Sequence, residues 1–259
     1  MTRLLEVTHL EKSYQGNMAV RDVSFGLDRG ELVALIGPNG AGKSTCFNML
    51  NGQIAPDRGS IRIEGRETTG MTPNRVWRLG VGRTFQITAT FASMSVRENV
   101  QTALLSSAKR SFVFWGSASG AQIGRADELL DLVGMKAEAR RPVAQLAYGD
   151  LKRLELAIAL ANDPRLLLMD EPTAGMAPKE RVELMRFVAQ IVRERGIGVL
   201  FTEHDMDVVF EHADRVMVLS RGELIAEGPP SEVRHNRGVQ AIYLGGGRVY
   251  DISHQEPTP

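Results

Sequence analysis

The chain of 259 residues is 43% hydrophobic and 24% charged, and its 31 basic and 31 acidic side chains cancel to a net charge of zero. This composition excludes disordered and fibrous proteins, and the length is enough to bury the core of one or two domains. The single cysteine, Cys46, excludes an intrachain disulfide and a cysteine-rich zinc site, and the neutral charge weighs against nucleic acid as the main partner.

Short apolar segments with strand character recur along the chain and are separated by helical patterns. In chain order we expect strands at 4–10, 20–27 and 31–36, a helix at 42–51, a strand at 60–64, helices at 127–133 and 151–161, a strand at 165–169, a helix at 179–195, and strands at 196–201 and 215–219. Strands that alternate with helices in this way predict an α/β fold with a largely parallel sheet.

Residues 87–161 differ from the rest because they carry several helical patterns and no convincing strand. We therefore expect a single domain in which 1–86 and 162–245 form the α/β core and 87–161 form a helical subdomain. The segment 246–259, which ends in Gln-Glu-Pro-Thr-Pro, is expected to be a tail with little reason to be ordered.

A phosphate-binding loop is predicted directly after the apolar run at 31–36. Its sequence matches G-x-x-x-x-G-K-[ST] and lies between a strand and a helix, as this motif requires. Glycines let successive main-chain N–H groups face phosphates, the helix adds its positive end, Lys43 can reach the β- and γ-phosphates, and Ser44 can bind Mg²⁺. The nucleotide-binding residues expected here are Gly37, Pro38, Asn39, Gly40, Ala41, Gly42, Lys43, Ser44 and Thr45. Cys46, in the following helix, is predicted to be a packing residue.

Two adjacent carboxylates, Asp170 and Glu171, follow the apolar strand at 165–169. If this strand ends beside the phosphate loop, Asp170 can reach Mg²⁺ while Glu171 faces the γ-phosphate and polarises a water molecule. Together with the loop, this pair predicts a nucleoside triphosphatase.

Over about residues 3–246 the chain also resembles the ATP-binding cassette (ABC) subunits of membrane transporters. Tyr14 matches the aromatic residue that stacks on adenine, and Gln86 the glutamine that senses Mg²⁺ and the water. His204 follows a strand and matches the switch histidine that contacts the γ-phosphate. Leu146-Ala-Tyr-Gly-Asp150 stands where the family's signature sequence belongs.

The resemblance implies a P-loop, ABC-type nucleotide-binding domain with a mixed or parallel β core, and an enzyme that hydrolyses ATP with Mg²⁺. It implies a head-to-tail dimer of cassettes, in which Ala147, Tyr148 and Gly149 of one subunit cap the ATP of the other. The catalytic residues would be Glu171, His204, Gln86 and Lys43, and the metal-binding residues Ser44, Gln86 and Asp170.

Four positions depart from the usual family pattern. Ala147 and Tyr148 stand where serine and glycine are usual, Asp150 replaces a glutamine, and Ala177 stands where many cassettes carry an aspartate that reaches across the dimer. Hydrolysis is still expected because Lys43, Asp170, Glu171 and His204 are all present. The rate of hydrolysis and the coupling between subunits stay open.

The Leu-Ala-Tyr-Gly form, the Thr-Glu-His-Asp-Met206 stretch and Tyr243-Leu-Gly245 resemble the branched-chain amino acid importer group. This implies partnership with two membrane permeases, a second cassette or another copy of this chain, and indirectly a solute-binding protein. The transported solute and the choice between homodimer and heterodimer stay open. The alternatives are a cassette of a lipid or lipopolysaccharide exporter, a non-transport ABC ATPase acting on DNA or ribosomes, and a small-molecule kinase or GTPase.

The helical subdomain is where cassettes of this family receive the permease, so we expect a location at the cytoplasmic face of the cell membrane. The first residues, Met1-Thr-Arg-Leu-Leu-Glu6, do not resemble a signal peptide. Some of six apolar residues are predicted to line a groove for the permease: Phe85, Phe91, Met94, Phe112, Phe114 and Trp115.

Overall fold

A six-stranded sheet forms the centre of the computed structural model, which describes residues 3–84, 90–107 and 122–244. Its strand order is β10-β9-β3-β8-β7-β6, and neighbouring strands are parallel except that the edge strand β10 is antiparallel to β9. The strands are β3 (Leu32–Ile36), β6 (Val81–Thr84), β7 (Leu166–Asp170), β8 (Gly198–Thr202), β9 (Arg215–Ser220) and β10 (Glu223–Gly228). The expectation of a largely parallel sheet is met here.

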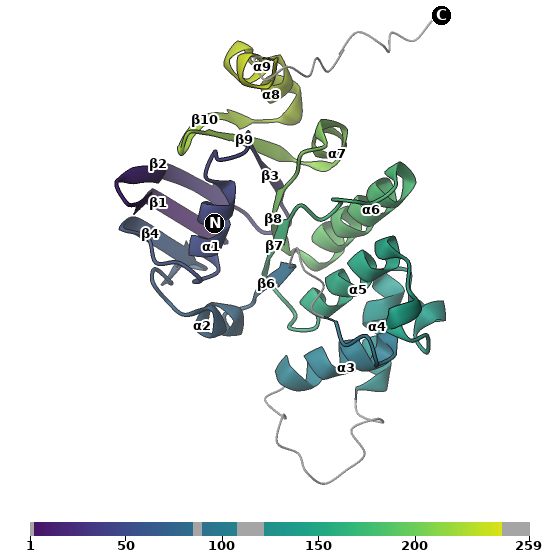
Figure 1. The fold of residues 1–259 in the computed structure, drawn as a ribbon. Helices are drawn as coiled ribbons and strands as arrows, with labels where there is room; N and C mark the ends of the chain where they lie inside the picture. The colour runs from purple at the N-terminus through teal and green to yellow at the C-terminus, as the bar shows by residue number, and fades with distance from the viewer. Residues whose placement is uncertain (1–2, 85–89, 108–121, 245–259) are drawn as a thin grey trace, which may run out of the picture.

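A second, antiparallel sheet with the order β2-β1-β4-β5 lies to the left in Figure 1. It consists of β1 (Leu5–Tyr14), β2 (Asn17–Leu27), β4 (Arg58–Ile63) and β5 (Arg66–Glu67). The sequence predicted strands here but no separate antiparallel sheet. Gln15 and Gly16, which join β1 to β2, both have positive φ (50° and 86°), the geometry of a tight hairpin turn.

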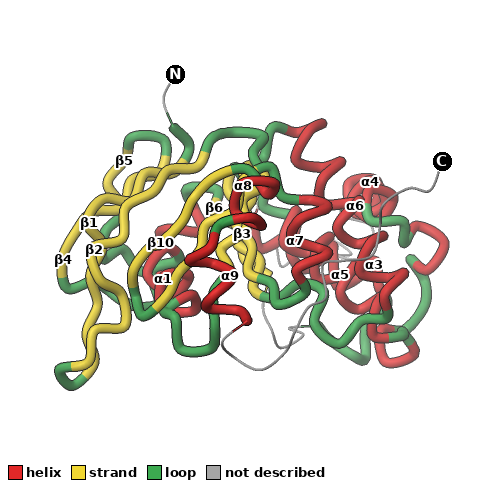
Figure 2. Tube along the Cα trace, turned by 90° about the horizontal axis from the view of Figure 1, so that it is seen from above, coloured by secondary structure: helices red, strands yellow, loops and turns green. Residues whose placement is uncertain are grey.

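The helices lie on both sides of the parallel sheet. They are α1 (Lys43–Leu50), α2 (Pro73–Arg78), α3 (Val96–Ser107), α4 (Ile123–Leu132), α5 (Tyr148–Leu160), α6 (Pro178–Arg195), α7 (Met206–His212), α8 (Pro230–His235) and α9 (Arg237–Leu244). Helices α3–α7 gather on the right in Figure 2, whereas α1 and α2 pack on the side of the antiparallel sheet. Within 90–107 and 122–161 the chain forms helices and short 3-10 turns and no strand beyond an isolated bridge. None of the described helices has the length and apolar character needed to cross a membrane.

The parallel sheet separates two hydrophobic cores. Alternate residues of β3 face opposite sides, so Ala34 and Ile36 pack with α3–α6, whereas Val33 and Leu35 pack with α1 and the antiparallel sheet. Cys46 is buried in the second core, where burial raises the pKa of its thiol to about 12. The prediction that Cys46 is a packing residue is therefore confirmed.

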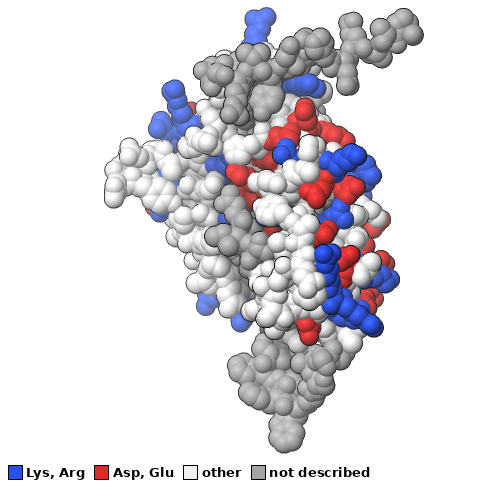
Figure 3. All heavy atoms as spheres, turned by 45° about the vertical axis from the view of Figure 1, so that its right-hand side comes forward, with Lys and Arg blue, Asp and Glu red and all other residues white. Residues whose placement is uncertain are grey.

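Acidic and basic side chains are interspersed on the face that carries the helices (Figure 3). Ion pairs such as Arg153 with Glu183 and Arg125 with Glu128 occur among them. The described residues of this face therefore present charges of both signs and no continuous basic surface.

Candidate nucleotide site

The predicted phosphate loop and catalytic residues come together at one edge of the parallel sheet. Gly37 follows the end of β3, Asp170 is the last residue of β7, and His204 comes two residues after β8. Because these strands are parallel neighbours, their carboxyl ends lie at the same edge, where α/β proteins usually bind ligands. Gln86, expected after β6, lies outside the described residues.

Two glycines are required by the shape of the loop. Gly37 has φ 154°, and a Cβ there would lie 2.1 Å from the carbonyl oxygen of Leu219. Gly42 has φ 106°, and a Cβ there would lie 2.3 Å from the carbonyl oxygen of Ala19. A side chain at either position would push the loop away from its neighbours. The loop leads directly into α1. The first N–H groups of this helix have no partner within the helix and can bind an anion.

The ammonium of Lys43 is held over this loop. Nζ donates to the carbonyl oxygens of Gly37 at 2.6 Å and Pro38 at 3.1 Å, and the residue is only 8% exposed. Burial lowers the pKa of Lys43, while the nearby carboxylates of Glu171 and Asp170 act in the opposite direction. The cation, the loop and the two carboxylates thus belong to one site.

Asp170 is fixed by two groups that the sequence did not single out. The Thr202 hydroxyl donates to Asp170 Oδ1 at 2.7 Å, and Arg83 Nη2 lies 3.6 Å from Asp170 Oδ2. Arg83 also donates to Asn48 Oδ1 in α1 at 2.9 Å, so it connects α1 to the acidic strand end. The Asp170 carboxylate and the exposed hydroxyl of Ser44 are the hard oxygen donors that Mg²⁺ prefers, so the residues present fit this ion.

Glu171 and His204 form a close pair, with His204 Nε2 lying 2.8 Å from Glu171 Oε1. Glu171 has φ 49°, a left-handed conformation that is uncommon for residues other than glycine and clusters at functional sites. Its main-chain N–H donates to the carbonyl oxygen and the hydroxyl of Thr202, both at 3.1 Å. The ring nitrogen of His204 contacts one carboxylate oxygen of Glu171, and the second oxygen can accept a hydrogen bond from water.

Of the other predicted binding residues, Tyr14 and Tyr148 are exposed, whereas Gly149 is buried. Tyr14 ends β1 with 44% of its surface exposed, which leaves its ring available for stacking. The signature residues open α5, where Tyr148 is 46% exposed and lies against Gly175, and Gly149 lies against the Glu180 carboxylate. Among the described residues no hydrogen bond joins this segment to the phosphate loop of its own chain.

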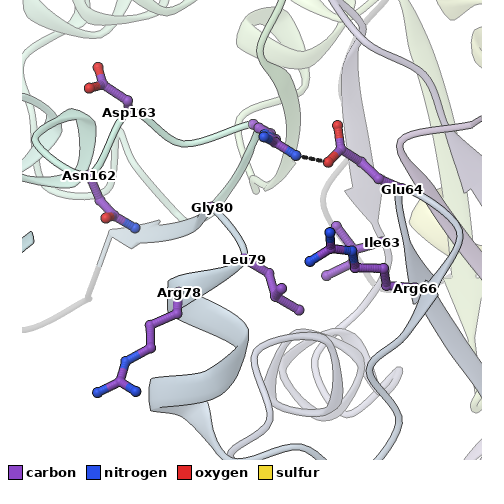
Figure 4. Close-up of a pocket in the computed structure, with 9 residues that line it drawn as sticks. Ile63, Glu64, Arg66, Arg78, Leu79, Gly80, Asn162 and Asp163 are labelled. Atoms are coloured by element: carbon purple, nitrogen blue, oxygen red, sulfur yellow. Dashed lines mark hydrogen bonds and ion pairs between the residues drawn. The ribbon is translucent and has the colours of Figure 1, made fainter.

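A pocket of about 250 Å³ lies at the opposite end of the parallel strands (Figure 4). Gly80 and Arg165 directly precede β6 and β7, so the pocket is at their amino ends, whereas the phosphate loop is at the carboxyl end of β3. Arg165 pairs there with Glu64, and the arginines lining the pocket are exposed. The pocket is separate from the predicted nucleotide site.

The fold and the site define a P-loop nucleotide-binding protein. The family model described as ABC transporter matches residues 20–174, and the model described as branched-chain amino acid ATP-binding cassette transporter matches residues 223–249. The chain belongs to the ABC transporter family and is an ATP-binding cassette. The known activity of this family is ATP hydrolysis coupled to transport. The family and fold class inferred from the sequence are confirmed.

Named relatives agree with this assignment. The chain is 39% identical to the high-affinity branched-chain amino acid transport ATP-binding protein LivG of Salmonella typhimurium, over 93% of this chain and 98% of LivG. It is 36% identical to the lipopolysaccharide export system ATP-binding protein LptB of Acidithiobacillus ferridurans, over 95% and 98%. The crystal structure of the ADP conformation of MJ1267, an ATP-binding cassette of an ABC transporter, matches with a TM-score of 0.84 and 26% identity, over 95% and 100% of the two chains.

Proposed function

We propose that this chain powers the uptake of branched-chain or related amino acids through membrane permease subunits. The observation that carries the proposal is the match of residues 223–249 to the branched-chain amino acid cassette model, in a part of the chain distinct from the nucleotide motifs. The similarity to LivG over almost the whole chain supports it. Lipopolysaccharide export is the second candidate because the identity to LptB is only slightly lower.

In the proposed mechanism the loop 37–45 and Lys43 bind the phosphates of ATP, and Tyr14 stacks on adenine. Ser44, Asp170 and Gln86 would hold Mg²⁺, which neutralises developing phosphate charge when bound. Glu171 orients the attacking water through its free carboxylate oxygen. His204 holds Glu171 at 2.8 Å and, as the family resemblance implies, would also contact the γ-phosphate. The preorganised contacts to Thr202 and Arg83 support this arrangement.

We propose that two cassettes work head to tail, this chain pairing with itself or with a second cassette. The chain carries one copy of each motif, and among the described residues no hydrogen bond joins its Ala147–Gly149 segment to its own phosphate loop. Tyr148 is exposed, and the amino end of α5 offers N–H groups for the nucleotide of the opposite subunit. The division into a core of 1–86 and 162–245, a helical subdomain of 87–161 and a tail of 246–259 belongs to the same proposal.

Reconstitution of the chain with its co-purifying membrane subunits in vesicles tests the function. We expect ATP-dependent uptake of radiolabelled leucine or valine when the matching solute-binding protein is present, and none with ADP. Extraction of lipopolysaccharide in place of amino acid uptake would favour the second candidate. Absence of any membrane subunit in the purified complex, with normal ATPase activity, would contradict a transport role.

Phe91 gives a direct test of the proposed permease contact. The residue is 54% exposed, and hydrogen bonds of its main-chain N–H and C=O with Asn99 of α3 hold its backbone. Phe91→Asp should therefore leave the fold and ATP binding unchanged while abolishing co-purification with the permease, because a charge replaces apolar contact surface. Met94 is partly buried beside it, and the other four aromatic residues predicted for this groove lie outside the described residues.

Ile225→Asp is the matched control for this experiment. Ile225 is 41% exposed on β10, which forms the edge of the parallel sheet opposite β6, and its replacement also puts a charge on an exposed apolar position. The Ile225→Asp variant should assemble normally with the permease. Equal assembly of both variants would remove Phe91 from the permease surface.

A further inference from the structure

Three consecutive residues, Thr202, Glu203 and His204, each contact the segment that contains the catalytic carboxylates. Thr202 bonds to Asp170 and Glu171, and His204 bonds to Glu171. Between them, the carboxylate of Glu203 accepts from the main-chain N–H of Thr173 at 2.8 Å and from its hydroxyl at 2.6 Å. The other carboxylate oxygen of Glu203 accepts from the N–H of His204 at 3.1 Å.

Glu203 is buried, which is unusual for a glutamate side chain. It is 3% exposed and Thr173 is 1% exposed. A buried carboxylate is costly unless donors surround it, and removing one donor from such a group leaves a desolvated acceptor without a partner. The three donors here come from the two loops that carry Glu171 and His204, so the carboxylate ties these loops together.

A second connection lies beside the first. Arg181 donates to the carbonyl oxygen of Met176 at 2.8 Å and to Asp205 Oδ2 at 2.5 Å, and Asp205 in turn caps the start of α7. The loop after Glu171 and the loop around His204 are thus joined at two places, through Glu203 and through Arg181. Displacement of one loop relative to the other would change the separation of Glu171 and His204 directly.

We propose that Glu203 is a positioning residue for ATP hydrolysis, whose buried carboxylate holds the Thr173 loop and the His204 loop in register so that Glu171 and His204 stay paired. The inference rests on the proposed roles of Glu171 and His204 and extends them to a residue that does not contact the nucleotide. In this proposal Glu203 positions the group that orients water, Glu171, and takes no part in binding ATP. Loss of Glu203 should therefore lower kcat and leave ATP affinity unchanged.

Glu203→Gln is the first test because it keeps the shape and removes one acceptor. Whichever way the amide turns, its NH₂ group faces a main-chain N–H, either that of Thr173 or that of His204. We expect kcat for Mg-ATP to fall by about tenfold or more, on the scale of small misplacements of catalytic groups. The ATP dissociation constant should stay within about twofold. Glu211→Gln, the same change on the exposed face of α7, is the control and should match the unmodified chain.

Thr173→Val is the second variant, and it keeps the test decisive if Glu203→Gln fails to fold. It removes only the hydroxyl donor and keeps the volume, so we expect a smaller fall in kcat, again at constant ATP affinity. In folded variants, kcat within twofold of the unmodified chain, or an equal loss of ATP affinity, would overturn the inference.

A double-mutant cycle separates positioning from general destabilisation. If Glu203 acts through Glu171, adding Glu203→Gln to Glu171→Gln should lower kcat little further, whereas independent effects would multiply. Full multiplication would overturn the inference. If Glu171→Gln alone keeps normal turnover, the proposed role of Glu171 fails. If Glu171→Gln is slow but Glu203→Gln is not, only the inference about Glu203 fails.

Discussion

Glu171→Gln should bind ATP normally and turn it over at least about 10² times more slowly. The amide keeps the shape of the side chain, and its oxygen can still accept from His204 Nε2, which lies 2.8 Å from Glu171 Oε1. What it loses is the negative charge that orients and deprotonates water, and a loss of 10² or more is the scale of general-base effects. Steady-state ATPase rates and equilibrium binding of a fluorescent ATP analogue measure the two quantities separately.

The control for this experiment is again Glu211→Gln, which removes an exposed carboxylate from α7. Thermal unfolding of both variants should occur within a few degrees of the unmodified chain. Turnover of Glu171→Gln within a few-fold of normal would reject Glu171 as the group that orients water, and reduced ATP affinity would mean that its charge serves binding instead.

The parallel strands could be predicted because they are buried on both faces. β3 is a continuous apolar run, β7 and β8 are apolar up to their last residues, Asp170 and Thr202, and every residue of β3 and β8 is buried. β6 was missed since its four residues, Val81-Gly-Arg-Thr84, include a glycine and an arginine. β10 was missed as well, although its burial alternates, because it is an edge strand that begins with Glu223 and ends with Glu227 and Gly228.

The pairing of strands is less visible in the sequence than their existence. The segments that form β1 and β2 were expected as strands, but nothing in their periodicity says that they pair with β4 in a sheet of their own. That pairing depends on contacts between residues 47 to 58 positions apart, such as Leu5 with Ile63. Periodicity reports which face of a strand is buried and not which strand lies beside it.

The same limit applies to the site. The convergence of Lys43, Asp170 and His204 follows from motifs placed after parallel strands, whose carboxyl ends meet. The contacts of Thr202 and Glu203 depend on the register of β7 against β8, in which Asp170 lies opposite Thr202. A polar Thr-Glu pair directly after the apolar run at 196–201 was the available signal, and it becomes informative only when the neighbouring strand is known.

Lys43 should contribute to ATP binding itself, which separates it from Glu171. Its buried ammonium lies at the phosphate loop, where it can form charge-assisted hydrogen bonds to phosphate that are worth about 1.5–3 kcal/mol, or roughly 10- to 100-fold in affinity. Lys43→Ala should therefore raise the ATP dissociation constant by about this factor. Isothermal titration calorimetry with Mg-ATP and with adenosine measures the effect, and adenosine binding should not change because Lys43 acts on the phosphates.

Lys43→Met separates loss of charge from loss of packing. Methionine keeps most of the buried aliphatic volume but cannot donate to the carbonyl oxygens of Gly37 and Pro38, so it should weaken ATP binding as much as alanine does. Lys136→Ala, which removes an exposed ammonium paired with Asp131, should leave binding unchanged. If Lys43→Met binds ATP normally while Lys43→Ala does not, the side chain of Lys43 supports the loop by packing. Its charge would then make no contribution to binding the phosphates.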